Sequence, residues 1–110
     1  MSPNEIGFFQ FDNLVKNRVP FALLSFELNW DGFYVESIYQ NHLMSLVLDV
    51  SHKEFLGSLK SKSLPKDFAI VAICKKGKDS ARAIKVLEKE GYSNVYSIVG
   101  GFESLVKDRS

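Results

Sequence analysis

One stretch of the chain predicts both a fold and a site: Phe68-Ala69-Ile70-Val71-Ala72-Ile73-Cys74-Lys75-Lys76-Gly77-Lys78-Asp79-Ser80. Residues 68–73 form an unbroken apolar run, which is typical of a central parallel strand that is buried on both faces. Residues 80–90 follow with apolar side chains at helical spacing and charged side chains between them. A strand, a loop and a helix in this order indicate an α/β domain.

The same alternation of short apolar runs and amphipathic segments continues on both sides of this stretch. Further strands are predicted at residues 19–26, 45–50 and 95–99. Further helices are predicted at residues 11–17 and 102–107, and from Ser51 to the Ser61-Lys62-Ser63 cluster. Ser51 and Glu54 have the spacing of a capping box. We therefore expect an α/β domain of three layers, with a mostly parallel central sheet flanked by helices.

Residues 27–42 have no clear periodicity but are rich in aromatic side chains. They contain the pair Asp31-Gly32, which is favoured in tight hairpins. We expect either a β-hairpin or a loop that covers the core.

The length and composition of the chain exclude several classes of protein. Its 110 residues fit a single domain, residues 1–110, and 45% hydrophobic residues suffice for one core. One cysteine excludes an internal disulfide and fits a reducing compartment. The first residues lack a signal-peptide pattern, and no run approaches the ~20 apolar residues of a membrane span. We therefore predict a cytoplasmic protein.

Charge is distributed unevenly along the chain, although the net charge is only +1. Residues 75–89 contain six basic and two acidic residues, a local surplus of four, so the remainder sums to about minus three. A net charge this small does not indicate binding to nucleic acid or to a membrane. The positive charge instead follows directly after the only cysteine.

Cys74 is the candidate nucleophile. Ligands of open parallel sheets bind beyond the carboxyl ends of the strands, and Cys74 stands at such an end, before a helix. The free amides and the positive dipole of a helix N-terminus favour anions, and together with nearby lysines they favour a thiolate. Gly77 permits the loop to turn its N–H groups inward. Ser80 is expected to cap the helix.

Two plainer interpretations stand beside this one. A lone cysteine at the end of an apolar strand is often an inert, small hydrophobic residue. Each lysine of the loop is also compatible with an ordinary solvated surface. The glycine-containing loop and the helix start that follows it favour the reactive cysteine.

The stretch from Phe68 to Ser80 resembles the active-site loop of rhodanese-homology domains, in which an apolar strand delivers Cys into a C-x-x-G-x-x-S loop before a helix. The resemblance continues through Gly91-Tyr92-Ser93-Asn94-Val95-Tyr96, which is similar to the family's G-F/Y-x-N-V-Y element. It ends with Gly100-Gly101, the family's double glycine before its last helix. These elements span residues 68–108 in a fixed order, and they imply a rhodanese-like fold.

Upstream, the resemblance is looser. Ser25 and Glu27 stand where the family has the acid and the base of an Asp-Val-Arg element, so the internal polar brace is expected to be rebuilt. Residues 41–46 keep only His42 of the family's Gly-His-Ile-Pro-Gly-Ala element, and His42 is expected to be a buried structural residue. His52 is expected at the surface, at a helix start.

The resemblance implies a sulfurtransferase mechanism. The Cys74 thiolate would take the outer sulfur of a small anionic donor such as thiosulfate, and a thiol, cyanide or a protein acceptor would then remove it. Loop amides would hold the anion. Asp79 stands where a basic residue is common in the family, which weakens the positive field. No metal or organic cofactor is implied. The substrate-binding residues would be Lys75, Lys76, Gly77, Lys78, Asp79 and Ser80.

Two rival functions remain. A phosphatase variant of this topology needs Arg six positions after the cysteine to clamp a phosphoryl group. This chain has Ser80 there, and Arg82 lies two residues too late. The other rival is a non-enzymatic module that carries persulfide sulfur or binds a protein partner, for which residues 30–39 would offer an aromatic surface.

Overall fold

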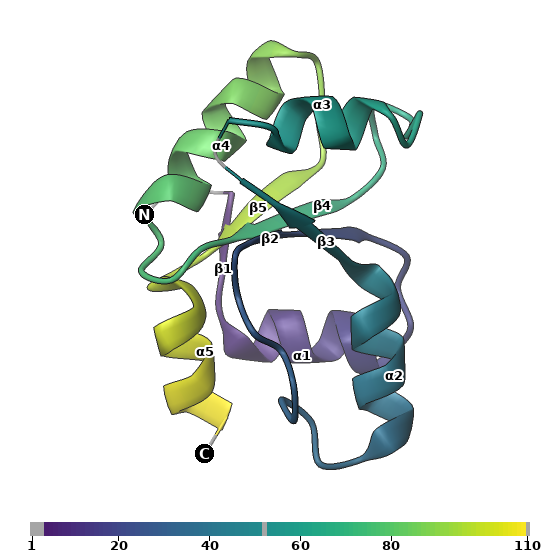
Figure 1. Cartoon of the computed structure of the whole chain (residues 1–110), viewed down its shortest axis with the longest axis vertical. Helices are drawn as coiled ribbons and strands as arrows, with labels where there is room; N and C mark the ends of the chain where they lie inside the picture. The colour runs from purple at the N-terminus through teal and green to yellow at the C-terminus, as the bar shows by residue number, and fades with distance from the viewer. Residues whose placement is uncertain (1–3, 52, 110) are drawn as a thin grey trace.

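Among the residues that the structure describes, five parallel strands form a central sheet in the order β1-β5-β4-β2-β3 (Figure 1). The computed structural model describes residues 4–51 and 53–109. The strands are β1 (Glu5–Ile6), β2 (Ala22–Phe26), β3 (Val47–Val50), β4 (Ile70–Ile73) and β5 (Val95–Ile98). All four residues of β4 are buried, as expected for a central strand. The predicted α/β class and parallel sheet are confirmed.

In the described part of the chain, five helices cover the two faces of the sheet. They are α1 (Phe8–Lys16), α2 (Ser37–Leu46), α3 (Phe55–Lys60), α4 (Lys78–Lys89) and α5 (Gly101–Arg109). Helices α3 and α4 lie on one face, while α1, α2 and α5 lie on the other (Figure 1). Each face has its own apolar core, because successive residues of a buried strand point to opposite sides. The predicted three layers are therefore confirmed.

The carboxyl ends of the parallel strands bring three loops to one edge of the sheet. Ser25 pairs with Ile73 in neighbouring strands, so β2 and β4 end at almost the same level. The segment after β2, the Cys74 loop after β4 and the double glycine after β5 consequently meet there. This edge is where the expected site lies.

The N-terminal region begins earlier than expected. Strand β1 has only two residues, too few to show a periodicity, and it pairs with β5. Helix α1 begins at Phe8 instead of residue 11, and Gly7 is its N-cap. The Gly7 N–H donates to Oε1 of Gln10 (3.0 Å), in the first turn of the helix.

The hairpin alternative for residues 27–42 is wrong. Residues 27–36 form a loop and residues 37–46 form α2, which also takes the first two residues of the strand predicted at 45–50. The side chain of Gln40 in α2 makes two hydrogen bonds to the backbone of this loop. Its Oε1 accepts from the Tyr34 N–H and its Nε2 donates to the Trp30 carbonyl, both at 2.8 Å.

The covering-loop alternative is confirmed by the aromatic residues of this segment. Trp30, Phe33 and Tyr34 are at most 8% exposed. The Trp30 ring stacks on Phe11 (5.9 Å between centroids) and meets Phe102 edge-to-face (4.8 Å). The loop therefore closes the core between α1 and α5.

A buried hydrogen bond between Ser25 and Trp30 forms the internal polar contact of this region. Ser25 is fully buried on β2, and its Oγ accepts a hydrogen bond from Nε1 of the buried Trp30 (2.9 Å). Glu27, at the other replaced position, is exposed and has a left-handed backbone (φ 60°). The partner of Ser25 is thus the Trp30 indole, and not the residue at the position of the family's base.

The capping box expected at Ser51 is wrong. Helix α3 begins at Phe55 with Glu54 as its N-cap residue, and no side chain caps it. Ser51 contributes its carbonyl instead, which accepts from the N–H groups of Glu54 (3.2 Å) and Phe55 (3.0 Å). His52 lies outside the described residues.

Candidate active site

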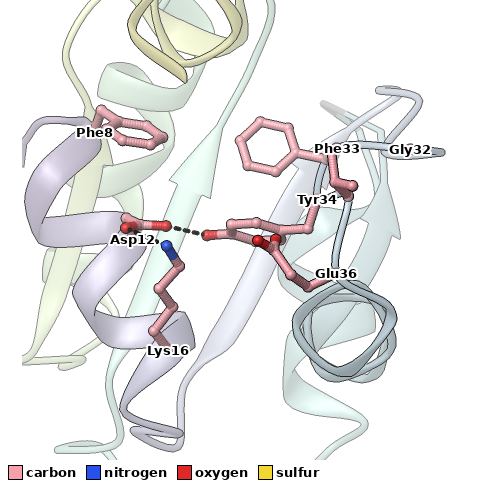
Figure 2. Close-up of a pocket in the computed structure, with 8 residues that line it drawn as sticks. Phe8, Asp12, Lys16, Gly32, Phe33, Tyr34 and Glu36 are labelled. Carbon is pink, nitrogen blue, oxygen red and sulfur yellow. Dashed lines mark hydrogen bonds and ion pairs between the residues drawn. The ribbon is translucent and has the colours of Figure 1, made fainter. Parts of the chain in front are cut away.

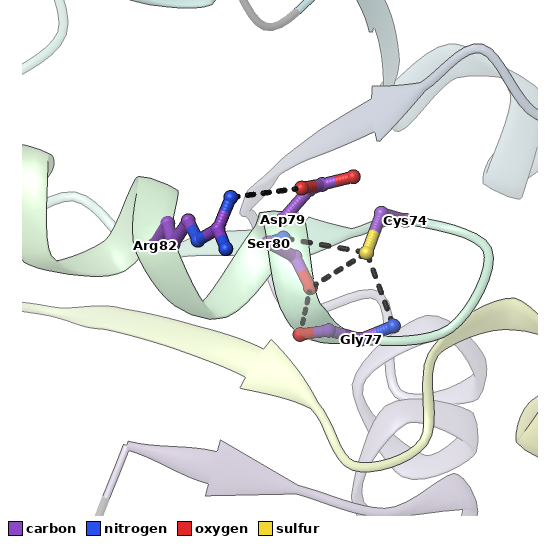
Figure 3. Close-up of polar contacts among 5 residues, drawn as sticks. All are labelled: Cys74, Gly77, Asp79, Ser80 and Arg82. Atoms are coloured by element: carbon purple, nitrogen blue, oxygen red, sulfur yellow. Dashed lines mark hydrogen bonds and ion pairs between the residues drawn. The ribbon is translucent and has the colours of Figure 1, made fainter.

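The Cys74 sulfur occupies the N-terminus of α4, as Figure 3 shows. Cys74 directly follows β4 and is only 4% exposed. Its Sγ accepts hydrogen bonds from the backbone N–H groups of Gly77 (3.1 Å) and Ser80 (3.3 Å). The N-cap residue is Gly77, which has no side chain that could accept a hydrogen bond from these donors. The sulfur therefore takes the place of a capping group, where a negative charge is most favourable.

Ser80 lies inside the first turn of α4 and is not its cap, so that expectation is wrong. The helix begins two residues earlier, at Lys78, and Ser80 is fully buried. The Ser80 hydroxyl donates to the Gly77 carbonyl (3.2 Å) and lies 3.4 Å from the Cys74 sulfur (Figure 3). It can therefore accept from a thiol and turn to donate to a thiolate.

Hydrogen bonds to the Cys74 sulfur have a larger effect on the pKa of the thiol than its burial has. Burial by itself raises the pKa of the Cys74 thiol. The Ser80 hydroxyl and the backbone N–H groups of Ser80, Gly77 and Asp79 lower this pKa by more than burial raises it. The pKa of Cys74 therefore lies below its ordinary value. The principal causes of the lowering are these donors and not the lysine side chains.

Alkylation of Cys74 by iodoacetamide, followed against pH, tests this lowering. We expect a midpoint below the ~8.5 of a free thiol, because the folded loop stabilises the thiolate. Ser80→Ala removes one donor, so its midpoint should move upward while the two amides keep part of the effect. Ser61→Ala, which loses an exposed hydroxyl that donates to Ser58, is the matched control and should leave the midpoint unchanged. Equal midpoints in all three proteins would refute the role of Ser80.

The double glycine fixes the shape of the Cys74 loop from the opposite side. The Phe102 N–H at the start of α5 donates to the Cys74 carbonyl (2.8 Å), and the Glu103 N–H donates to the Lys75 carbonyl (3.1 Å). Gly101 has φ +69°, and a Cβ there would lie 2.5 Å from the Cys74 carbonyl oxygen. The loop and the α5 terminus can approach this closely only because position 101 has no side chain.

The charged residues of the loop form the rim of the site. Lys75, Lys76 and Lys78 are exposed. Oδ1 of Asp79 lies 3.8 Å from the Arg82 guanidinium, so Arg82 offsets the charge of the acidic residue (Figure 3). Of the residues expected to form the site, Cys74, Gly77 and Ser80 are in direct contact, and the backbone of Asp79 joins them through its N–H.

A hollow lies on the other face of the sheet from α4, between α1 and the 27–36 loop (Figure 2). The Tyr34 hydroxyl donates to Asp12 (2.8 Å), and Asp12 also pairs with Lys16 (3.3 Å). Burial, then the hydrogen bond to Asp12 and the charges of Asp12 and Glu36, raise the pKa of Tyr34. A tyrosine that stays protonated in this way is a hydrogen-bond donor, and the cluster fastens the covering loop to α1.

His42 does not belong to the site. It lies on α2, across the sheet from α4, and is half-buried, so its expected burial is only partly met (Figure 1). Its Nε2 is enclosed and has no hydrogen-bond partner within the described ranges. Within residues 4–51 and 53–109 we find no cluster of three potential metal-ligating side chains. Nor does the described part contain a helix long and apolar enough to span a bilayer.

The chain belongs to the rhodanese-like domain family. The family model for the rhodanese-like domain matches residues 39–108, which include α2 from its third residue and the chain from β4 to the next-to-last residue of α5. The match thus covers the cysteine loop and the double glycine but begins after the altered Ser25 region. The fold and the strand–loop–helix site agree with this family.

The chain is similar to curated relatives whose names include a sulfurtransferase activity, and it spans about one sixth of their length. The adenylyltransferase and sulfurtransferase MOCS3-2 of Zea mays is 31% identical over 77 residues, which are 69% of this chain but 16% of that protein. The human single-domain sulfurtransferase TSTD1 has a TM-score of 0.69 at 12% identity, covering 99% of this chain and 100% of that one. A rhodanese-like domain from Anabaena has a TM-score of 0.68 at 16% identity, covering 98% and 76%. At these identities the two structures show a shared fold.

Proposed function

We propose that this domain is a sulfurtransferase that moves a sulfane sulfur from a small anionic donor to a thiophilic acceptor through a persulfide on Cys74. The observation that carries the proposal is the set of donors on the Cys74 sulfur at the N-terminus of α4. They favour the thiolate, which is the nucleophilic form of cysteine. Family membership and the sulfurtransferase relatives support the same chemistry.

The reaction has two balanced half-steps. The Cys74 thiolate attacks the outer sulfur of thiosulfate, a new S–S bond forms, and the old S–S bond breaks with its electron pair leaving on sulfite. An acceptor such as cyanide then attacks the outer sulfur of the persulfide, and the electron pair of the broken S–S bond returns to Cys74. The Gly77 and Ser80 amides and the Ser80 hydroxyl stabilise the negative charge on Sγ before the first half-step and after the second. The rim lysines attract the anionic donor.

Mass measurement of the intact protein after incubation with thiosulfate tests the proposal. We expect a gain of one sulfur atom, located on Cys74, that disappears on addition of cyanide with release of thiocyanate. If neither thiosulfate nor a polysulfide or persulfide donor gives an adduct, the catalytic proposal fails. The domain would then be a non-enzymatic, protein-binding member of its family.

A further inference from the structure

Four basic side chains form a straight stripe along the outer surface of α4. They are Lys78, Arg82, Lys85 and Lys89, and all four are exposed. Their spacing of four, three and four residues puts them on one face of a helix. The stripe begins at the first residue of α4, next to the loop that contains the exposed Lys75 and Lys76. It runs away from the site for about 16 Å at 1.5 Å per residue.

Acidic groups lie beside this stripe but are fewer than its basic ones. Glu5 of β1 and Glu88 line one hollow together with Lys85. Asp79 lies 3.8 Å from Arg82, at the end nearest the sulfur. Glu88 is exposed on one flank of the helix, and Glu90 beyond its end pairs with Lys60 (2.7 Å). The local surplus of four positive charges therefore lies on one side of a chain whose remaining residues sum to about minus three.

An apolar groove follows the other flank of the stripe. It has a volume of about 380 Å³ and is lined by Phe55 of α3 and by Asp79, Arg82, Ala83 and Val86 of α4. Val86 is 40% exposed, which is high for an aliphatic side chain next to a buried core. A positive stripe beside an apolar groove matches an acidic polypeptide with some apolar side chains. It matches nucleic acid less well, because no residue of the stripe is aromatic and the rest of the chain is acidic.

We infer that the α4 stripe, defined as Lys78, Arg82, Lys85 and Lys89, is the docking surface for an acidic protein that accepts the sulfur of Cys74. This inference rests on the proposed function. An extended chain covers the stripe with about five residues at ~3.3 Å each, and it brings a thiol at its end to the site. That thiolate attacks the outer sulfur of the persulfide, a new S–S bond forms on the acceptor, and the electron pair of the old bond returns to Cys74.

Sulfur transfer from loaded protein to two synthetic cysteine peptides tests the inference. Each peptide has about ten residues, a length that spans the stripe, and ends in cysteine; one contains a run of Glu and the other Gln at the same positions. We expect about tenfold faster transfer to the Glu peptide at low salt, with the preference disappearing at about 1 M salt. In Lys85→Glu/Lys89→Glu the preference should be lost, although loading from thiosulfate continues. The control is Arg18→Glu/Lys62→Glu, which reverses two exposed charges at the opposite edge of the sheet and should keep the preference.

Binding of the labelled Glu peptide, measured by fluorescence anisotropy, separates this inference from the proposed function. If Cys74 cannot be loaded, the proposed function fails, while salt-sensitive binding that Lys85→Glu/Lys89→Glu abolishes would still support an acidic protein on the stripe. Equal binding by the wild type and this variant would overturn the inference. So would a single-stranded RNA that binds through the stripe while the Glu peptide does not, because the stripe would then serve nucleic acid.

Discussion

Replacement of Cys74 by serine is expected to abolish sulfur loading while the fold remains intact. Serine keeps an acceptor for the N–H groups of Gly77 and Ser80, so the cost in unfolding free energy should be about 1 kcal/mol. Its hydroxyl stays protonated at neutral pH and cannot carry a persulfide. Mass spectrometry after thiosulfate treatment should therefore show no added sulfur, and thiocyanate formation should fall to the rate without protein.

The control for this variant is structural. Circular dichroism and thermal unfolding should place Cys74→Ser within a few degrees of the wild type, as a difference of about 1 kcal/mol implies for a domain of this size. A folded variant that still gains sulfur would show that the reactive group is elsewhere. Since Cys74 is the only cysteine, no other thiol can replace it.

Replacement of Gly101 by alanine is expected to be the most damaging single-methyl change in the site. The new Cβ would lie 2.5 Å from the Cys74 carbonyl oxygen, 2.6 Å from the Gly77 nitrogen and 2.7 Å from the Lys75 carbonyl oxygen. These three atoms belong to the backbone, so no side chain can rotate away. We expect the unfolding free energy to fall by about 3 kcal/mol or more, together with slower sulfur loading, because the loop must move.

Gly32→Ala provides a matched control for the backbone conformation. Gly32 has the same φ of +69°, but a Cβ there would meet nothing within 4 Å. Gly32→Ala should therefore lower the unfolding free energy by about 1 kcal/mol, which is the cost of placing an alanine in the left-handed backbone conformation. Urea unfolding of both variants measures the difference. Equal losses of stability would mean that the close approach of Gly101 to the Cys74 loop does not exist in solution.

Patterns that are local in the chain predicted much of this structure. The apolar run before Cys74 identified the central strand, and the spacing of apolar residues after Ser80 identified the body of α4. Gly91 follows the end of α4 with φ +96°, the left-handed conformation that a glycine commonly adopts after a helix. Strand β1 and the start of α1 were missed because two residues of strand and one helical turn leave too weak a periodicity.

The start of α4 illustrates why local patterns place a site only approximately. Serine is a good N-cap residue, so the sequence favoured a helix start at Ser80. The fold brings the Cys74 sulfur to the same N–H groups, and Gly77 becomes the N-cap residue. Ser80 is thereby buried and becomes a partner of the sulfur. The lysines, which the charge pattern made prominent, lie on the rim and are not the principal cause of the lowered thiol pKa.

By itself, the sequence determined the strand–loop–helix unit and the cysteine at its turn, because apolar periodicity and turn residues act over a few neighbouring positions. Only the tertiary structure decided what surrounds that cysteine. The approach of Gly101 to the Cys74 loop joins residues 27 positions apart in the chain, and the Gln40 side chain connects the covering loop to α2. The Ser25–Trp30 bond depends on where the loop after β2 folds back. Such contacts depend on the packing of whole elements against one another, which no local pattern of residues encodes.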